Sequence, residues 1–312
     1  MTTTTDTTLT LAHSPDADDL VMFWPLTGIR TPDGTPIEGP LGKPQLDTAP
    51  FTFDLIARDV EELNQAAIDD SSTPYDITAI SCAAYPKLQD RYRITRSGAS
   101  FGENYGPKLV VREDSALQTL DDLINADPLV AVPGLNTSAS MTLNLIKPGV
   151  RTDPMLFSSI TEAVNQGRVD AGLLIHEAQL TFKDLGLRAI GDMGQWWFAH
   201  TSGLPIPLGL NVIARSLDTR FGPGTTDRVS DMLSESIRIA HEERSASKQF
   251  LKLNMGTRTE WNDDALVDRY LDMYVSPMTL DMGDPGRNAI NRFLSEGASA
   301  KLCPECPDID IT

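Results

Sequence analysis

The chain has few cysteines and a shortage of positive charge. Its 312 residues include three cysteines, Cys82, Cys303 and Cys306, an odd number without the spacing of a disulfide framework. Cys303 and Cys306 have C-x-x-C spacing, but no second such pair or paired-histidine set is present to complete a zinc site. We therefore interpret them as incidental thiols of a surface tail and expect no metal site.

The charge balance excludes several classes of partner. Lys and Arg number 26 against 44 Asp and Glu, a formal net charge of -18. This balance argues against nucleic acid and anionic membrane as partners, since both repel negative charge. A small anionic ligand is still compatible with it, because a local site can oppose the overall field. The sequence does not indicate an oligomeric state.

Targeting signals, membrane anchors and nucleotide-binding motifs are also missing. Residues 1–8 contain no Lys or Arg and lack the apolar segment of a secretory signal, and no apolar run approaches a membrane span. We therefore expect a cytoplasmic location. No G-x-G-x-x-G, P-loop or H-E-x-x-H pattern occurs, so we expect neither a nucleotide cofactor nor a catalytic metal.

The chain instead alternates strand and helix signals. Residues 27–50, rich in Gly and Pro, predict a long excursion with a hairpin. Strands are expected at 8–12, 51–55, 76–80, 108–111, 129–132, 155–157, 172–175, 187–190 and 208–214. Helices are expected at 20–24 (with Ser14 as N-cap), from 59, from about 139, and at 159–166, 227–243, 245–253, 263–274 and 286–295.

This alternation predicts an α/β protein with mostly parallel sheets covered by helices on both faces. Pro/Gly-containing junctions at 106–107 and 205–207 divide the chain, whose length suffices for two domains. The helical last third needs a sheet to pack on. We therefore expect two lobes joined by two crossovers, with a cleft between them. Residues 1–108 and 210–312 would form a discontinuous lobe I, and residues 109–209 lobe II.

The candidate for chemistry is His176. It ends the apolar run of residues 171–175, which reads as a buried strand, and ligand sites of α/β sheets lie beyond the carboxyl ends of strands. Histidine also has the side-chain pKa nearest neutrality. The alternative is a structural histidine at a strand end. Glu177 points the opposite way on an extended chain, so we interpret it as a possible helix start.

Four further candidate residues lie in segments that follow predicted strands. Thr137 and Ser138 stand where a strand turns into a helix, whose N-terminal amides can bind an anion, although Thr137 or Asn136 can equally serve as a plain N-cap. Ser81 follows a strand and either donates to a substrate or caps a turn. Asp18, like its acidic neighbours, suits the positive end of a helix and is also a candidate for binding sugar hydroxyls.

Eight separated motifs, in the same order throughout, carry a resemblance that covers roughly residues 9–295. They are SPDADD (14–19), DVEELN (59–64), SCAAY (81–85), RSG (96–98), GPKLVV (106–111), VPG (132–134), AGLLIHE (171–177) and TSGLPIPLG (201–209). The chain resembles the 1,4-dihydroxy-6-naphthoate synthase family of the futalosine route to menaquinone.

The resemblance implies a two-lobed type II periplasmic-binding-protein-like fold. It also implies a carbon–carbon lyase that needs no cofactor and converts cyclic dehypoxanthine futalosine, a small carboxylate, into 1,4-dihydroxy-6-naphthoate. By resemblance, His176 is the proton acceptor. One substrate-binding segment comprises Ala79, Ile80 and Ser81, and the other comprises Ser138 and Ala139.

The chain departs from the family pattern at three places. Asp18 stands where many members have Asn, Ala79 stands where a Lys can occur, and residues 27–50 resemble an insertion. Two other functions stay open. One is a solute-binding protein of the same fold without chemistry, and the other is chorismate dehydratase, an enzyme of the same pathway and fold. The His-bearing segment argues against the latter.

Overall fold

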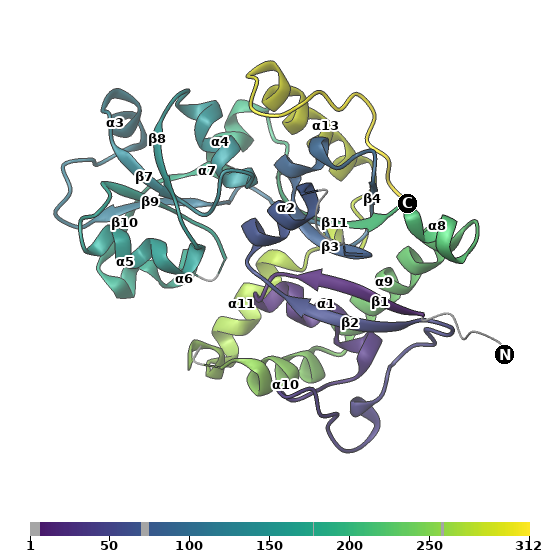
Figure 1. Cartoon of the computed structure of the whole chain (residues 1–312). Coiled ribbons are helices and arrows are strands. Elements are labelled where there is room, and N and C mark those ends of the chain that lie inside the picture. The colour runs from purple at the N-terminus through teal and green to yellow at the C-terminus, as the bar shows by residue number, and fades with distance from the viewer. Residues whose placement is uncertain (1–6, 70–74, 177, 257–258) are drawn as a thin grey trace.

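The computed structural model describes residues 7–69, 75–176, 178–256 and 259–312. Two sheets lie in separate lobes (Figure 1). The first lobe contains the sheet β2-β1-β3-β11-β4, with β5 paired to β11, and the second contains the sheet β10-β6-β9-β7-β8. The expected two-lobed α/β fold is confirmed. The predicted domain limits, 1–108 with 210–312 and 109–209, stay a prediction, although β6 already begins at Lys108 and β11 at Ile206.

Most expected strands are present. The strands are β1 (Thr8–His13), β2 (Thr52–Ala57), β3 (Ile77–Ser81), β4 (Tyr92–Ile94), β5 (Ser100–Gly102), β6 (Lys108–Arg112), β7 (Leu129–Val132), β8 (Arg151–Pro154), β9 (Ala171–Leu174), β10 (Leu187–Asp192) and β11 (Ile206–Ala214). The sequence analysis does not predict β4 and β5, and β8 lies at other residues than expected.

The expected helices are present, and α3, α7, α8 and α12 are additional. The α-helices are α1 (Ala17–Thr27), α2 (Val60–Ile68), α3 (Leu120–Asn125), α4 (Ser138–Ile146), α5 (Ile160–Asn165), α6 (Ala178–Thr181), α7 (Met193–His200), α8 (Ser216–Phe221), α9 (Thr225–Glu242), α10 (Arg244–Asn254), α11 (Asp264–Tyr274), α12 (Pro277–Leu280) and α13 (Gly283–Ser299). Short 3₁₀ helices are η1 (Pro40–Gly42), η2 (Cys82–Lys87), η3 (Phe157–Ser159), η4 (Phe182–Leu185) and η5 (Thr259–Asn262).

The expectation of mostly parallel sheets is wrong in part. β1 pairs in parallel with β2 and β3, and β7 with β8 and β9. By contrast, β11 is antiparallel to β3, and β6 is antiparallel to both β9 and β10. The antiparallel pairs involve strands next to the crossings between the lobes, β6 after the first and β11 after the second, so the simple βα alternation is interrupted there.

The excursion expected at 27–50 contains a short antiparallel hairpin, in which Arg30 bridges Pro36 and the amide of Thr31 donates to the carbonyl oxygen of Thr35 over 2.9 Å. Two local predictions are wrong. Residues 151–154, not 155–157, form the strand, and Phe157 begins a 3₁₀ turn. The first helix has Asp16 rather than Ser14 at its N-cap, because the Ser14 hydroxyl donates to the Asp16 carboxylate instead of closing the helix end.

The C-terminal helices supply the first lobe with core. Leu9 and Leu11 of β1 pack with Met22 of α1 and with Leu233 and Ile237 of α9 in one buried cluster. α13 covers the other side of this lobe (Figure 1) and packs against β11.

The interpretation of Cys303 and Cys306 as thiols of a surface tail is inaccurate, because both are partly buried and pack against the core cluster that contains Cys82. Burial raises the pKa of Cys306 to about 11. No described helix has the length and apolarity to cross a membrane.

The two segments that pass between the lobes lie against each other. The amide of Met193 donates to the carbonyl oxygen of Pro107 over 2.9 Å. A Cβ atom on Gly194 would lie 1.9 Å from the carbonyl oxygen of Tyr105. Glycine is required at 194 because no side chain fits between these two backbones.

We expect Gly194→Ala to lower the free energy of unfolding by about 1–3 kcal/mol, since the added methyl forces the two crossing segments apart. Gly209→Ala is the matched control, because its Cβ would meet its nearest atom, the Ile80 carbonyl oxygen, at an ordinary 3.7 Å. Thermal and urea denaturation measure both variants. Equal stability of the two would contradict the close approach at 194.

Candidate active site

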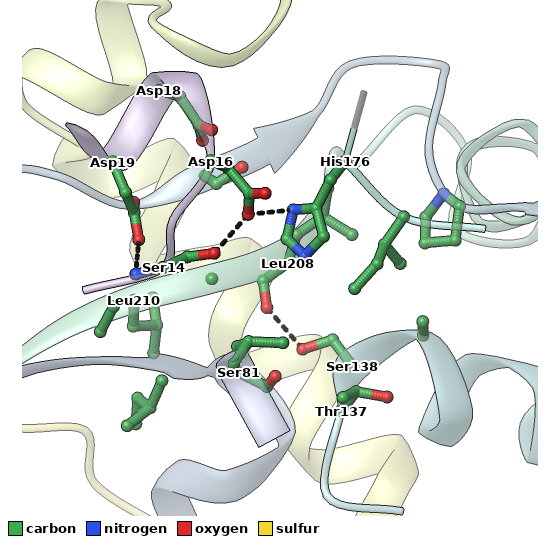
Figure 2. A pocket seen from close by; sticks show the side chains of 18 of the residues that line it. Ser14, Asp16, Asp18, Asp19, Ser81, Thr137, Ser138, His176, Leu208 and Leu210 are labelled. Carbon is green, nitrogen blue, oxygen red and sulfur yellow. Dashed lines mark hydrogen bonds and ion pairs between the residues drawn. The ribbon is translucent and has the colours of Figure 1, made fainter. Parts of the chain in front are cut away.

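A cavity lies where the two lobes meet. It encloses about 690 Å³, counting the space open at its mouth. Its lining comes from both lobes, including the start of α1 and β3 on one side, and the start of α4 and the end of β9 on the other (Figure 2). All eight candidate residues line it, namely Asp18, Ala79, Ile80, Ser81, Thr137, Ser138, Ala139 and His176. The described lining residues include no Lys or Arg.

His176 is the second residue after β9, and the backbone turns sharply there. Its backbone φ is 61°, in the left-handed region, which costs a non-glycine residue about 1–3 kcal/mol. Its side chain is 18% exposed, and Nδ1 lies 2.5 Å from Oδ2 of Asp16. The ring of Phe157 packs edge-on against the imidazole, with centroids 4.6 Å apart. The strained backbone thus directs the imidazole toward the opposite lobe. Glu177 lies outside the described residues.

An acidic wall faces the imidazole. Asp16 occupies the N-cap position of α1, and its side chain accepts from the Ser14 hydroxyl. The Asp19 carboxylate accepts from the Ser14 amide over 2.8 Å. Asp18 accepts a buried hydrogen bond of 2.9 Å from the hydroxyl of Tyr270 on α11. Each carboxylate therefore has its own donor in the first lobe.

Burial reduces the charge that this wall carries. It raises the pKa of Asp18 to about 6, with the Asp16 charge adding to the effect while His176 and the Tyr270 hydroxyl oppose it. Burial, and to a smaller extent the charge of Asp18, holds the pKa of Asp19 well above its usual range. His13 lies behind the wall and has its pKa lowered, chiefly by burial. Burial therefore opposes the ionised forms of both Asp18 and Asp19.

The opposite part of the cavity offers hydroxyl and amide groups. Ser81 ends β3, where its amide donates to Asn64 Oδ1 over 2.8 Å and its hydroxyl accepts from Asn64 Nδ2 over 3.1 Å. Ser81 occupies the N-cap position of η2, but its side chain makes no capping hydrogen bond. The capping alternative for Ser81 is therefore wrong. Ala79 and Ile80 precede it on β3 and contribute apolar lining.

The start of α4 closes this side. Thr137 is the N-cap, and its side chain accepts from the amide of Ser140 over 3.2 Å, so the capping alternative holds for Thr137. The hydroxyl of Ser138 donates to the carbonyl oxygen of Leu208 over 2.6 Å and accepts from the amide of Ala83 over 3.2 Å. Ser138 therefore bridges the lobes. First-turn amides of a helix have no intrahelical acceptor, so this helix end suits an anion.

Sequence reasoning does not find two contacts of His176. At the level of sequence Asp16 is one of several acidic residues at a helix start, and its contact with a histidine 160 positions away has no local signal. The strand predicted at 155–157 conceals the packing of Phe157 on His176. Buried polar groups of Gln179 and Asn211 also line the cavity. Among the described residues, no group of three or more His, Cys, Asp or Glu is arranged to hold a metal ion.

We expect Asp18→Asn to stabilise the fold increasingly as pH rises from about 4 to about 6. The pKa of Asp18 is raised from 3.8 to about 6, so the folded state holds a proton that the unfolded chain releases. The free energy of unfolding of the wild-type protein therefore falls as pH rises through this window. Asn cannot ionise, so the variant should be more stable than wild type by about 1–3 kcal/mol above pH 6. Thermal unfolding of both proteins at pH 4 and pH 7.5 measures this difference, and an equal difference at both pH values would contradict the raised pKa.

The sequence and the fold both match known proteins. Residues 9–299 match a family described as "Menaquinone biosynthesis". The 1,4-dihydroxy-6-naphthoate synthase of Streptomyces coelicolor is 32% identical over 303 residues, 95% of each chain. That of Thermus thermophilus is 31% identical over 301 residues, 96% of this chain and 97% of the relative. Among solved structures, the alkanesulfonate-binding protein SsuA of Xanthomonas axonopodis pv. citri shares the fold, with a TM-score of 0.64, 15% identity and 98% coverage of both chains. The chain belongs to the menaquinone biosynthesis family.

Proposed function

We propose that this protein is an enzyme that converts cyclic dehypoxanthine futalosine into 1,4-dihydroxy-6-naphthoate, as a carbon–carbon lyase with His176 as general base. The observation that carries the proposal is the imidazole of His176 beside a buried carboxylate at the wall of an interlobe cavity. Two relatives that share nearly the whole chain bear the name of this synthase. The expected cytoplasmic location is part of the same proposal.

The two ends of the cavity suit the two ends of such a substrate. The sugar hydroxyls would face the acidic wall, where Asp16, Asp18 and Asp19 offer acceptors beside His176. The carboxylate would lie toward Ser81 and the first turn of α4, where hydroxyls and amides are donors. Since the described lining holds no Lys or Arg, these neutral donors would carry the recognition of the anion.

The chemistry needs one proton to move first. In the proposed reaction, His176 takes the proton of a sugar hydroxyl, and the resulting alkoxide collapses to a carbonyl as the adjacent carbon–carbon bond breaks. The electrons of that bond pass to the departing carbon, which is then protonated. General-base help of this kind contributes about 10²–10⁴-fold. Ala79 and Ile80 would contact the aromatic part of the substrate, because both are apolar residues of the cavity lining.

The test is incubation with cyclic dehypoxanthine futalosine, followed by mass analysis for the naphthoate, with chorismate in a parallel reaction. We expect naphthoate from the first and no change in the second. His176→Ala is expected to lower kcat by about 10²–10⁴-fold because it removes the base, while circular dichroism shows that the variant still folds. Substrate that is bound and recovered intact would favour a solute-binding protein. Consumption of chorismate would favour the dehydratase.

Ser81→Ala is expected to raise KM by roughly tenfold with little change in kcat, because one hydrogen bond to a charged group contributes about 1.5 kcal/mol and acts before and during the reaction. Steady-state kinetics measure both constants. Ser295→Ala, an exposed position on α13, is the control and should leave both unchanged. A loss confined to kcat would contradict a binding role for Ser81.

A further inference from the structure

The carboxylate that contacts His176 belongs to the other lobe. Asp16 follows β1 of the first sheet, whereas His176 follows β9 of the second. The 2.5 Å contact between Asp16 Oδ2 and His176 Nδ1 therefore crosses the cleft, as Figure 2 shows. This pairing exists when the two lobes stand as they do in this structure.

Asp16 is held firmly from its own side. The residue is 1% exposed, and its Oδ2 accepts from the Ser14 hydroxyl. Its carbonyl oxygen accepts from the amide of Leu20 over 2.9 Å as α1 begins. The positive end of the helix dipole favours the ionised carboxylate there. Asp16 is thus a fixed acceptor at the edge of the cavity.

A fixed acceptor determines where the imidazole carries its proton. A carboxylate has no hydrogen to donate, so His176 Nδ1 must carry the hydrogen of this contact. In the neutral ring the lone pair is then on Nε2, the nitrogen that can accept a proton. In Figure 2 the second ring nitrogen lies on the side of the ring away from Asp16. Phe157 packs on the ring and limits its rotation.

We propose that Asp16 is the positioning residue for His176, and that the meeting of the lobes completes the base at the moment it encloses the substrate. The proposal rests on the proposed function, in which His176 takes a proton. A base assembled in this way needs both lobes in place, because the imidazole takes its orienting partner from the other lobe.

The other acidic groups near His176 are engaged elsewhere. The pKa values of Asp18, Asp19 and Asp59 all respond to the charge of His176. Yet Asp18 accepts from Tyr270, and Asp19 accepts from the Ser14 amide. Asp59 is the N-cap of α2 and accepts from the amide of Glu61 over 2.8 Å. Asp59 therefore serves as the matched control, because Asp59→Asn removes a nearby charge but keeps a good N-cap.

The first experiment is a double-mutant cycle with kcat and KM measured on cyclic dehypoxanthine futalosine. We expect Asp16→Asn to lower kcat roughly 10–100-fold, the usual effect of losing a partner that orients a histidine, with KM within about threefold of wild type. Asp59→Asn should lower kcat less than about threefold. In a His176→Ala background, Asp16→Asn should cause no further loss, because its effect passes through the imidazole. An equal further loss in that background would overturn the proposal.

The second experiment reads the imidazole without turnover. Nitrogen-15 NMR of the protein labelled at its four histidines, with His176 assigned by the His176→Ala spectrum, reports which ring nitrogen carries the proton. We expect the Nδ1–H form in wild type and in Asp59→Asn, and a mixture in Asp16→Asn. An unchanged His176 signal in Asp16→Asn overturns the positioning role, whether or not the substrate is converted. Absence of wild-type turnover with the expected NMR change refutes the proposed function and leaves the Asp16–His176 coupling standing.

Discussion

A carboxylate kept from water needs partners, and this requirement organises the cleft. Asp16 is 1% exposed, and burying a charge without partners costs several kcal/mol. Ser14 supplies one partner from the same loop, and His176 supplies another from the opposite sheet. The left-handed backbone at His176 makes the second contact possible, because it turns the side chain away from the line of β9. The strained backbone of His176 in one lobe thus gives the buried carboxylate of Asp16 in the other lobe a partner.

The cavity has two chemically different ends that match this arrangement. The acidic wall belongs to the start of α1, and the neutral donors belong to Ser81 and to the start of α4. Ser138 links the start of α4 to the first lobe through hydrogen bonds with Leu208 and Ala83. Proteins such as SsuA share the fold at 15% identity. In the proposed function, the same two-lobed fold places a general base in the cavity, whereas a binding protein needs only contacts that hold its ligand.

Much of the fold could be predicted because its signals are local. Apolar runs ended by polar residues located β1, β3, β7, β9 and β11, and the position of His176 beyond a strand end predicted that it would lie at the cavity. The direction of strand pairing could not be predicted, since β6 joins β9 and β10 through contacts set by the crossings between lobes. The contact of Asp16 with His176 could not be predicted for the same reason. Its role depends on which residues the closed lobes bring together, and charge at a helix start is explained equally well by the helix dipole.

The lack of basic side chains in the described cavity lining has a kinetic consequence. A chain of net charge -18 repels an anion at long range, and no Lys or Arg at the described cavity wall reverses that field locally. Added salt screens repulsion over distances of about 10 Å at 0.1 M ionic strength. Capture of an anionic ligand should therefore speed up with ionic strength, the opposite of the behaviour of sites that steer anions with a ring of cations.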